Sequence, residues 1–394
     1  MKVGFFIGAL KKEIGGSYTF LESLLRSFDS VETTHEIIVF YYGDHKPSGF
    51  SNQISFVSLS SGRKLEWIVQ KGVSFLSSKR TSTLQLAADY FRIELLWFFS
   101  TDFVPVDTPY ICSVLDLEYR AHPFFPEVGT IDRWLAIDNL FTPMIQRAAY
   151  IMSGTATGKE QIVNYFKADG RRVRVIPFPV APFAIEQKSP PSLHTQKKSE
   201  QKPYLFYPAQ FWPHKNHIVL LHALKLIRDK YGLDFDLVLC GSDKGNLSYI
   251  KRKCQEFGLE SHVRFLGFVS REELYELYLY AFALVFPSMF GPDNLPPLEA
   301  FAIGCPVVAA RLTGAEDQLR DNVLYFDPLC EEEIATAVLQ LRQNPDLRAH
   351  LIEKGKARAA NWTATDYLRE IITIFDEFEK YRRCWSRSEK FVLN

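Results

Sequence analysis

The segment PSMFGPDNLPPLEAFAIGCPVVAA, residues 287–310, constrains the fold more than any other stretch of the chain. It follows an apolar run typical of a buried strand, and Gly291 interrupts regular structure soon after that run ends. We expect a helix over residues 295–303, because Pro296 and Pro297 suit a first helical turn, in which an amide hydrogen has no helical partner. A strand–loop–helix unit of this kind directs a helix N-terminus toward the carboxyl end of the strand, where a phosphate group can bind.

Glu299 in this predicted helix has two interpretations. Its charge can complement the helix dipole or close a capping box. Alternatively, its carboxylate can accept hydrogen bonds from a ribose diol beside a phosphate held by the amides of Asn294, Leu295 and Leu298. The motif alone leaves both open.

The composition predicts a soluble enzyme of two domains. A chain of 394 residues, 47% of them hydrophobic and 23% charged, suggests two domains of roughly 200 residues each. The formal net charge of zero favours neither nucleic acid nor an acidic partner. The six cysteines lack metal-ligand spacing, so we expect reduced thiols in a cytoplasmic protein and no bound metal.

The N-terminal residues are not typical of a signal peptide, and no apolar run approaches the ~20 residues that span a membrane. Residues 62–80 mix basic residues with Trp67, Phe75 and other apolar side chains. This segment is either a helix against the core or a peripheral contact with the anionic inner face of a membrane.

Strands and helices alternate through both halves of the chain, which predicts an α/β protein with two parallel sheets that face a central cleft. The first domain is predicted over residues 1–180. A linker over 181–203 is rich in Pro, Ser and Lys. The second domain covers 204–370, and a C-terminal helix within 371–394 can cross back to the first domain.

Three loops of the first half are candidates for ligand contact. Gly15 and Gly16 predict either a tight turn or a close backbone approach to a phosphate or sugar. The segment AAYIMSGTATGKEQIVNYF, residues 148–166, predicts a strand, a Ser/Gly/Thr loop and a helix whose N-terminus is free for an anion. A predicted strand over 110–120 ends in a polar cluster that is either ordinary loop chemistry or part of a site: Asp116, Glu118, Tyr119, Arg120 and His122.

Several motifs together resemble a known family. YPAQFWPHKNH (207–217), LCGS (239–242), VRFLGFVS (263–270) and the 287–310 segment occur in that order, and VLDLEYRAHPFFPE precedes them. The chain resembles the retaining glycosyltransferases of family 4, which have the GT-B fold of two Rossmann-like domains. No G-x-G-x-x-G motif is present, which disfavours an NAD-dependent dehydrogenase.

The resemblance implies a role for individual residues. Lys215 binds the donor diphosphate, Glu299 holds the ribose hydroxyls, and these two with Asp116 are the catalytic candidates. Tyr119, Arg120 and His122 lie on the acceptor side. The remaining donor-binding candidates are Gly15, Gly16, Gln210, Gly241, Phe268, Val269, Asp293, Asn294, Leu295 and Pro296.

The sequence also departs from the family pattern. Gln210 replaces the usual arginine, Leu115 replaces the histidine expected before Asp116, and Gly291 replaces the first glutamate of the Glu-x7-Glu motif. We expect Asp293 either to reach the sugar in place of that glutamate or to stabilise the Gly-Pro turn. Asn294 beside it is expected to cap the helix or to brace the backbone.

The implied reaction is retaining transfer of a hexose or deoxyhexose from a GDP- or UDP-linked donor to a glycan or lipid-linked oligosaccharide, without metal or cofactor. Such a reaction serves surface polysaccharide synthesis. One alternative is a GT-B nucleotide-sugar epimerase or hydrolase. Another is a non-catalytic GT-B subunit that stabilises a partner transferase, which the missing glutamate and histidine would explain.

Overall fold

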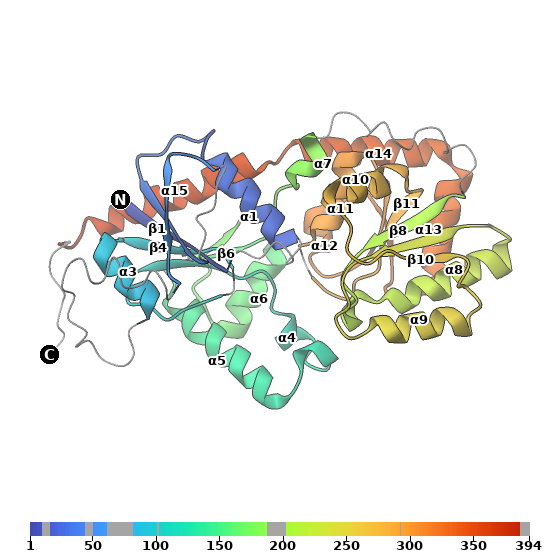
Figure 1. Ribbon diagram of the computed structural model, residues 1–394, viewed down its shortest axis with the longest axis horizontal. Coiled ribbons are helices and arrows are strands. Elements are labelled where there is room, and N and C mark those ends of the chain that lie inside the picture. The colour runs from blue at the N-terminus through green and yellow to red at the C-terminus, as the bar shows by residue number, and fades with distance from the viewer. Residues whose placement is uncertain are drawn as a thin grey trace.

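A computed structural model describes residues 1–9, 16–43, 50–60, 82–100, 102–186, 202–291 and 293–386. The chain forms two α/β domains side by side, each built on a parallel sheet (Figure 1). The predicted contact of Gly15 and the segment 62–80 lie outside the described residues.

The N-terminal domain contains a seven-stranded sheet in the order β3-β2-β1-β4-β5-β6-β7, with every neighbouring pair parallel. Its strands are apolar runs because both faces of the sheet are covered, as in β4, where all four residues are buried. The strands are β1 (Lys2–Ala9), β2 (Glu36–Tyr42), β3 (Ile54–Ser58), β4 (Leu95–Phe98), β5 (Tyr110–Ser113), β6 (Tyr150–Ser153) and β7 (Val173–Val175).

Side-chain caps define several helix starts in this domain. Ser82, Thr130 and Thr155 each accept a hydrogen bond from the backbone amide three residues later. The helices are α1 (Gly16–Ser27), α3 (Thr83–Phe91), α4 (Glu118–Ala121), η2 (Pro126–Val128), α5 (Ile131–Arg147) and α6 (Ala156–Phe166).

The second domain repeats this plan with a six-stranded parallel sheet in the order β10-β9-β8-β11-β12-β13. The strands are β8 (Tyr204–Pro208), β9 (Asp236–Cys240), β10 (Val263–Phe265), β11 (Ala283–Phe286), β12 (Val307–Ala310) and β13 (Leu324–Phe326). The helices are α7 (Pro182–Glu186), η4 (Pro213–Lys215), α8 (His217–Tyr231), α9 (Leu247–Glu256), α10 (Arg271–Tyr280), α11 (Leu295–Ile303), α12 (Ala315–Leu319), α13 (Glu331–Gln343) and α14 (Pro345–Ala360). The prediction of two α/β domains with parallel sheets is confirmed.

The last helix, α15 (Ala364–Arg382), returns from the second domain to the first (Figure 1). Its Leu368, Ile371 and Phe375 are fully buried in the core formed by β1, α1 and β4. At the crossing, the indole of Trp362 donates a hydrogen bond of 2.8 Å to the carbonyl of Pro177. The C-terminal helix therefore contributes to the core of the first domain.

The strand predicted over 110–120 is shorter than expected. β5 ends at Ser113, and the polar cluster includes the short helix α4. The Asp116 carboxylate accepts the backbone amide of Glu118 at 3.3 Å, which turns the chain away from the sheet.

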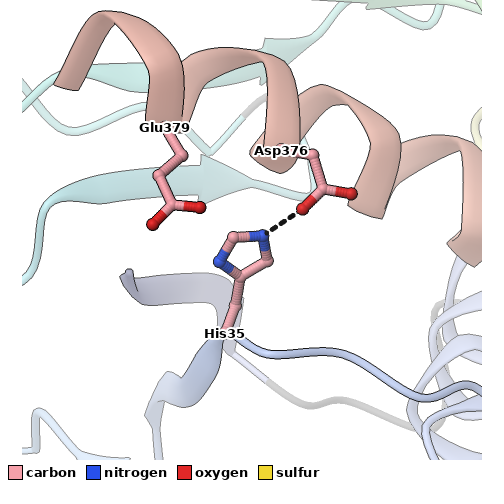
Figure 2. A group of neighbouring side chains, drawn as sticks. All are labelled: His35, Asp376 and Glu379. Atoms are coloured by element: carbon pink, nitrogen blue, oxygen red, sulfur yellow. Dashed lines mark hydrogen bonds and ion pairs between the residues drawn. The ribbon is translucent and has the colours of Figure 1, made fainter. Parts of the chain in front are cut away.

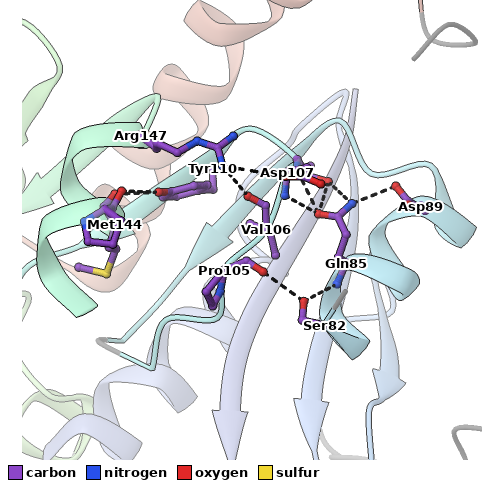
Figure 3. Close-up of polar contacts among 11 residues, drawn as sticks. Ser82, Gln85, Asp89, Pro105, Val106, Asp107, Tyr110, Met144 and Arg147 are labelled. Carbon is purple, nitrogen blue, oxygen red and sulfur yellow. Dashed lines mark hydrogen bonds and ion pairs between the residues drawn. The ribbon is translucent and has the colours of Figure 1, made fainter. Parts of the chain in front are cut away.

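A polar network fixes the loop that precedes β5, at the amino end of the strand (Figure 3). The amide group of Gln85 in α3 accepts hydrogen bonds from the backbone of Asp107 and Thr108 and donates to Asp89. The phenol of Tyr110 donates to the carbonyl of Met144 at 2.9 Å. These contacts join α3, β5 and α5, and they have a structural role remote from the carboxyl ends of the strands.

Candidate functional site

The two domains contact each other through segments that follow the carboxyl ends of their strands. Hydrogen bonds or ion pairs join Glu22 to Arg271, Glu127 to His214, Thr157 to Asp317 and Phe178 to Asp293. Six residues at the centre of this contact form what we call the interdomain site: Asp116 and Glu127 from the first domain, and His214, Lys215, Ser288 and Phe290 from the second.

Lys215 ends the 3-10 turn η4, immediately after β8 and before α8. Its Nζ lies 3.4 Å from the hydroxyl of Ser288 and 5.7 Å from the ring centre of Phe286. Burial lowers the pKa of Lys215 to about 8, although the nearby charges of Asp116 and Glu127 act in the opposite direction. Lys215 is therefore a partly desolvated cation near two acids of the other domain. A charged donor of this kind can bind a phosphate group.

Asp116 faces Lys215 from the loop after β5. Asp116 is an exposed residue, but desolvation by the surrounding protein raises the pKa of its carboxyl group, and the amide of Glu118 and the charge of Lys215 offset part of that rise. Two of the three catalytic candidates, Asp116 and Lys215, therefore lie close enough for each charge to act on the pKa of the other.

Glu127 joins the domains at His214. Its Oε1 accepts the backbone N–H of His214 at 3.0 Å and also the Nδ1–H of the same residue. Its Oε2 is buried and has no hydrogen-bond partner among the described residues. Burial lowers the pKa of His214 to about 4, with a further contribution from Lys215, so the imidazole is neutral at pH 7.

Aromatic rings complete this contact. Phe290 stacks on His214 at a centroid distance of 4.1 Å and on His122 of the first domain at 5.4 Å. Phe125 meets the edge of Phe290 at 5.1 Å. The loop after β11 is therefore clamped between residues of both domains.

Glu299 lies in α11 and is buried. Its Oε2 accepts the hydroxyl of Tyr278 at 2.8 Å, and burial raises its pKa to about 7. Asn294, the N-cap residue, makes no side-chain cap, so neither a capping box nor a side-chain cap closes this helix. Burial raises the pKa of Cys240, the last residue of β9, and the charge of Glu299 adds to that rise.

Asp293 has a different environment from the sugar contact that we expected. Its Oδ2 accepts the backbone N–H of Phe178 at 3.2 Å, and its Oδ1 accepts the amide of Gln318. A Cβ atom added to Gly154 would lie 1.8 Å from Oδ2. Both oxygens of Asp293 therefore bind protein groups at the domain contact, and we assign it an interdomain structural role.

Asn294 braces the loop. Its side chain donates to the carbonyl of Gly291, and its backbone amide donates to Gln318 at 3.1 Å. That amide, which we expected to be available to a phosphate, is already bonded. Leu295 and Pro296 form the first turn of α11 as predicted.

Two glycines are required by the backbone. Gly291 has φ of +105°, a conformation that side chains rarely adopt, and this explains why no glutamate stands there. At Gly241, with φ of +147°, an added Cβ would lie 2.2 Å from the carbonyl oxygen of Ala209. Gly241 is therefore required because its backbone lies close to the backbone of the segment that follows β8.

The loop after β10 carries Phe268, of which 74% is exposed, followed by the partly buried Val269. The carbonyl of Gly267 accepts the amide of Gly241, so this loop lies beside the end of β9. Gln210 accepts the indole N–H of Trp212 at 3.0 Å. Gly16 is the first residue of α1.

The three acceptor-side candidates separate in the structure. Tyr119 and Arg120 both bind Asp138 of α5, and the guanidinium of Arg120 lies 4.5 Å from the ring centre of Phe166. They join α4, α5 and α6 and are structural. His122 instead accompanies the interdomain site through Phe290 and binds Glu118 at 2.6 Å.

We expected the N-terminus of α6 to be open to an anion, but a carboxylate of the protein occupies it. The amide and hydroxyl of Thr157 donate to the Asp317 carboxylate of the second domain at 3.3 and 3.4 Å.

One group within the described ranges has the spacing of a metal site: His35, Asp376 and Glu379 (Figure 2). Both ring nitrogens of His35 already have partners, because Nε2 lies 3.0 Å from Asp376 and Nδ1 lies 3.2 Å from the amino group of Met1. The group fastens α15 to the first domain, away from the interdomain site.

Sequence reasoning missed Glu127, His214, Ser288 and Phe290. All four stand inside motifs quoted for the family resemblance: Glu127 in HPFFPE, His214 in FWPHKNH, and Ser288 and Phe290 in the 287–310 segment. No spacing in either motif indicates that Glu127 and His214 meet, since they are 87 residues apart and belong to different domains.

Comparisons with known proteins are consistent with this geometry. Residues 191–358 match the family model described as "Glycosyl transferases group 1". The O-antigen chain mannosyltransferase RfbU of Salmonella typhimurium is 29% identical over 202 residues, which cover 51% of this chain and 53% of the relative. The O-antigen chain mannosyltransferase B of Escherichia coli is 25% identical over 240 residues, covering 60% and 63%. The alignments thus span about half to two thirds of these relatives.

Solved structures share the complete architecture. WaaG, a glycosyltransferase involved in lipopolysaccharide biosynthesis, has a TM-score of 0.69 at 14% identity, with 94% of this chain and 99% of WaaG covered. Anabaena Alr3699/HepE in complex with UDP has a TM-score of 0.68 at 15% identity, covering 96% and 100%. The chain has the GT-B fold. Within the described residues, no helix is both long and apolar enough to cross a membrane.

Proposed function

We propose that this protein is a retaining, metal-independent glycosyltransferase of family 4. In this proposal it transfers a hexose, with mannose the first candidate, from a GDP- or UDP-linked donor to a glycan hydroxyl. The observation that carries the proposal is Lys215, a partly desolvated cation after β8 that faces acids of the opposite domain. The family match over 191–358 and the names of the two bacterial relatives support the reaction class and the sugar.

In the proposed mechanism, the second domain binds the donor. Lys215 holds the diphosphate, and the amino end of α11 adds the positive end of a helix dipole as the leaving group departs. Glu299 binds the ribose hydroxyls near β9, and the exposed Phe268 covers the nucleobase. Gly241 and Val269 line the same strand ends, and the proposal keeps Gly15 and Gly16 as binding residues of the first domain for the diphosphate.

The acceptor is proposed to enter from the first domain. Asp116 faces Lys215 there, and it can hold the acceptor hydroxyl beside the anomeric carbon. The fold relationship with a glycosyltransferase of lipopolysaccharide biosynthesis supports a growing surface glycan or lipid-linked oligosaccharide as the acceptor. We propose that the reaction takes place in the cytoplasm, with peripheral contact at the inner face of the membrane.

A thermal-shift panel with GDP, UDP, dTDP and ADP tests the donor class. A ligand at about 100 times its dissociation constant should add about 2.7 kcal/mol to the free energy of unfolding. The responding nucleotide is then tested as its mannosyl and glucosyl ester, with and without a lipid-linked oligosaccharide. Sugar release that does not depend on acceptor would indicate a hydrolase or epimerase.

The glycine at 291 favours a second candidate, a non-catalytic GT-B subunit that stabilises a partner transferase. Such a subunit needs no nucleotide. If none of the four nucleotides raises the melting temperature, this second function replaces the first.

A further inference from the structure

We infer that Glu127 binds the donor sugar, supplied by the first domain in place of the acid that is absent at Gly291. The inference rests on the proposed transferase function and identifies a sugar-recognition residue of the same site. It follows from three properties of the interdomain site.

The first property is the unequal use of the two carboxylate oxygens of Glu127. Oε1 accepts two hydrogen bonds from His214, while the buried Oε2 accepts none from any described residue. The side chain is only 11% exposed, so water has little access to it. A buried acceptor without a donor is costly, and a ligand that brings hydroxyl donors satisfies it.

The second property is that the other acids of this region are engaged or lie elsewhere. Asp293 binds Phe178 and Gln318, and Glu299 binds Tyr278 in the second domain. Glu118 binds His122 at 2.6 Å. The backbone at Gly291 disfavours any side chain. Asp116 accepts the amide of Glu118 and is an exposed residue, so water can reach its carboxylate. Among the acids of the interdomain site that the structure describes, Glu127 combines a fixed position with a buried, unpaired oxygen.

The third property is proximity to Lys215. The charge of Glu127 acts on the pKa of Lys215, and the two residues are linked through His214, the immediate neighbour of Lys215. A sugar attached to a diphosphate held by Lys215 therefore lies next to this carboxylate. An ionised carboxylate only accepts hydrogen bonds, so it attracts sugar hydroxyls and repels phosphate oxygens. This chemistry assigns Glu127 to the sugar rather than to the nucleotide.

Glu127→Gln separates sugar binding from domain contact. The glutamine carbonyl can still accept both bonds from His214, whereas its amide group is a donor where Oε2 was an acceptor. We expect the affinity for the intact nucleotide sugar to fall about tenfold to a hundredfold, the range for a hydrogen bond to a charged group. The affinity for the bare nucleoside diphosphate should stay within about twofold. Titration calorimetry with both ligands measures the two affinities.

Glu22→Gln is the matched control. It removes another carboxylate that joins the domains, through the 2.8 Å contact with Arg271, outside the interdomain site. If looser domain contact explained the Glu127→Gln result, the control would show the same loss of sugar-nucleotide affinity. We expect the control to keep both affinities.

The outcomes distinguish this inference from the proposed function. Wild-type protein that binds no nucleotide sugar refutes the transferase proposal and the inference with it. Wild-type binding with equal losses of both affinities in Glu127→Gln, or with no loss, refutes the inference alone. Glu127→Ala, which also removes the His214 contact, should lose affinity for the sugar nucleotide at least as strongly, and wild-type affinity in that variant also refutes it.

Discussion

Replacing Lys215 with methionine should raise the stability of the folded protein and lower its affinity for the nucleoside diphosphate. Methionine has a similar length and no charge, so the change removes the cation and leaves little empty volume. Lys215 has a folded-state pKa of about 8, below its ordinary 10.5, because burial disfavours its charged form. A tenfold change in proton affinity corresponds to about 1.4 kcal/mol. Keeping this lysine charged therefore costs the folded protein about 3 kcal/mol at pH 7.

The sign of the pH dependence follows from the lowered pKa. Between about pH 8 and 10.5 the folded protein binds fewer protons at Lys215 than the unfolded chain, so this lysine makes the protein more stable as pH rises through that range. At pH 7 its full cost is present. Lys215→Met should therefore raise the melting temperature by several degrees at pH 7 and gain less at pH 10.

Binding should change in the other direction. A diphosphate stabilises the protonated lysine, so wild-type affinity for the nucleoside diphosphate should fall above pH 8, by up to tenfold per pH unit. The phosphate itself ionises at about pH 6 and contributes no slope there. In Lys215→Met the affinity should be lower by about tenfold to a hundredfold at pH 7.5 and should not vary above pH 8.

Calorimetric titrations at pH 7.5, 8.5 and 9.5 beside melting curves test this reasoning. A variant that binds with wild-type affinity, or that retains the slope above pH 8, shows that Lys215 does not hold the diphosphate. A large drop in melting temperature would show instead that the lysine is a stabilising structural group.

Three further substitutions have defined outcomes. Glu299→Gln should weaken nucleoside-diphosphate binding yet raise the melting temperature at pH 8. Burial has raised the pKa of Glu299 to about 7, so above that pH its charge destabilises the folded protein. Calorimetric titration beside a melting curve tests this, and a lower melting temperature with unchanged binding contradicts it. Asp293→Ala should lower the free energy of unfolding by about 1–3 kcal/mol, since the amide of Phe178 loses its acceptor. It should leave the ratio of sugar-nucleotide to nucleotide affinity unchanged, and a selective loss of sugar-nucleotide affinity would restore Asp293 as the sugar ligand. His217 is fully buried, stacks on Phe211 at 4.3 Å, and has a pKa lowered to about 3 by burial, so protonation destabilises the folded state as pH falls below 6.5. His217→Phe should therefore lose less stability than wild type between pH 6.5 and 4 in urea titrations, and an unchanged acid dependence would exclude His217 as its source.

Local patterns in the sequence were sufficient to predict the architecture. Apolar strand runs such as FDLVLC and AFALVF alternate with amphipathic segments in both halves, and this alternation requires parallel sheets covered on both faces. The prolines at the start of the 295–303 segment and Gly304 after its end predicted both ends of α11 correctly, because helix termination depends on neighbouring residues.

The candidate site was only partly predictable, because local patterns do not show which residues of the two domains meet. Lys215, Glu299 and Asp116 were identifiable from their motifs, and the structure places Lys215 and Asp116 within electrostatic reach of each other. The role of Asp293 was not identifiable from its motif. An aspartate in a turn has the same sequence pattern whether its carboxylate contacts a sugar or the amide of Phe178 in the other domain.

The sequence by itself determined the two sheets, the helix that follows β11 and the lysine that follows β8, because each depends on residues within a few positions of one another. Only the tertiary structure decided which charges meet. Glu127 and His214, His122 and Phe290, and Asp317 and Thr157 come from opposite domains, and each pair forms only where the two sheets present their carboxyl ends to each other. Such contacts depend on the relative position of the domains, which no local periodicity specifies.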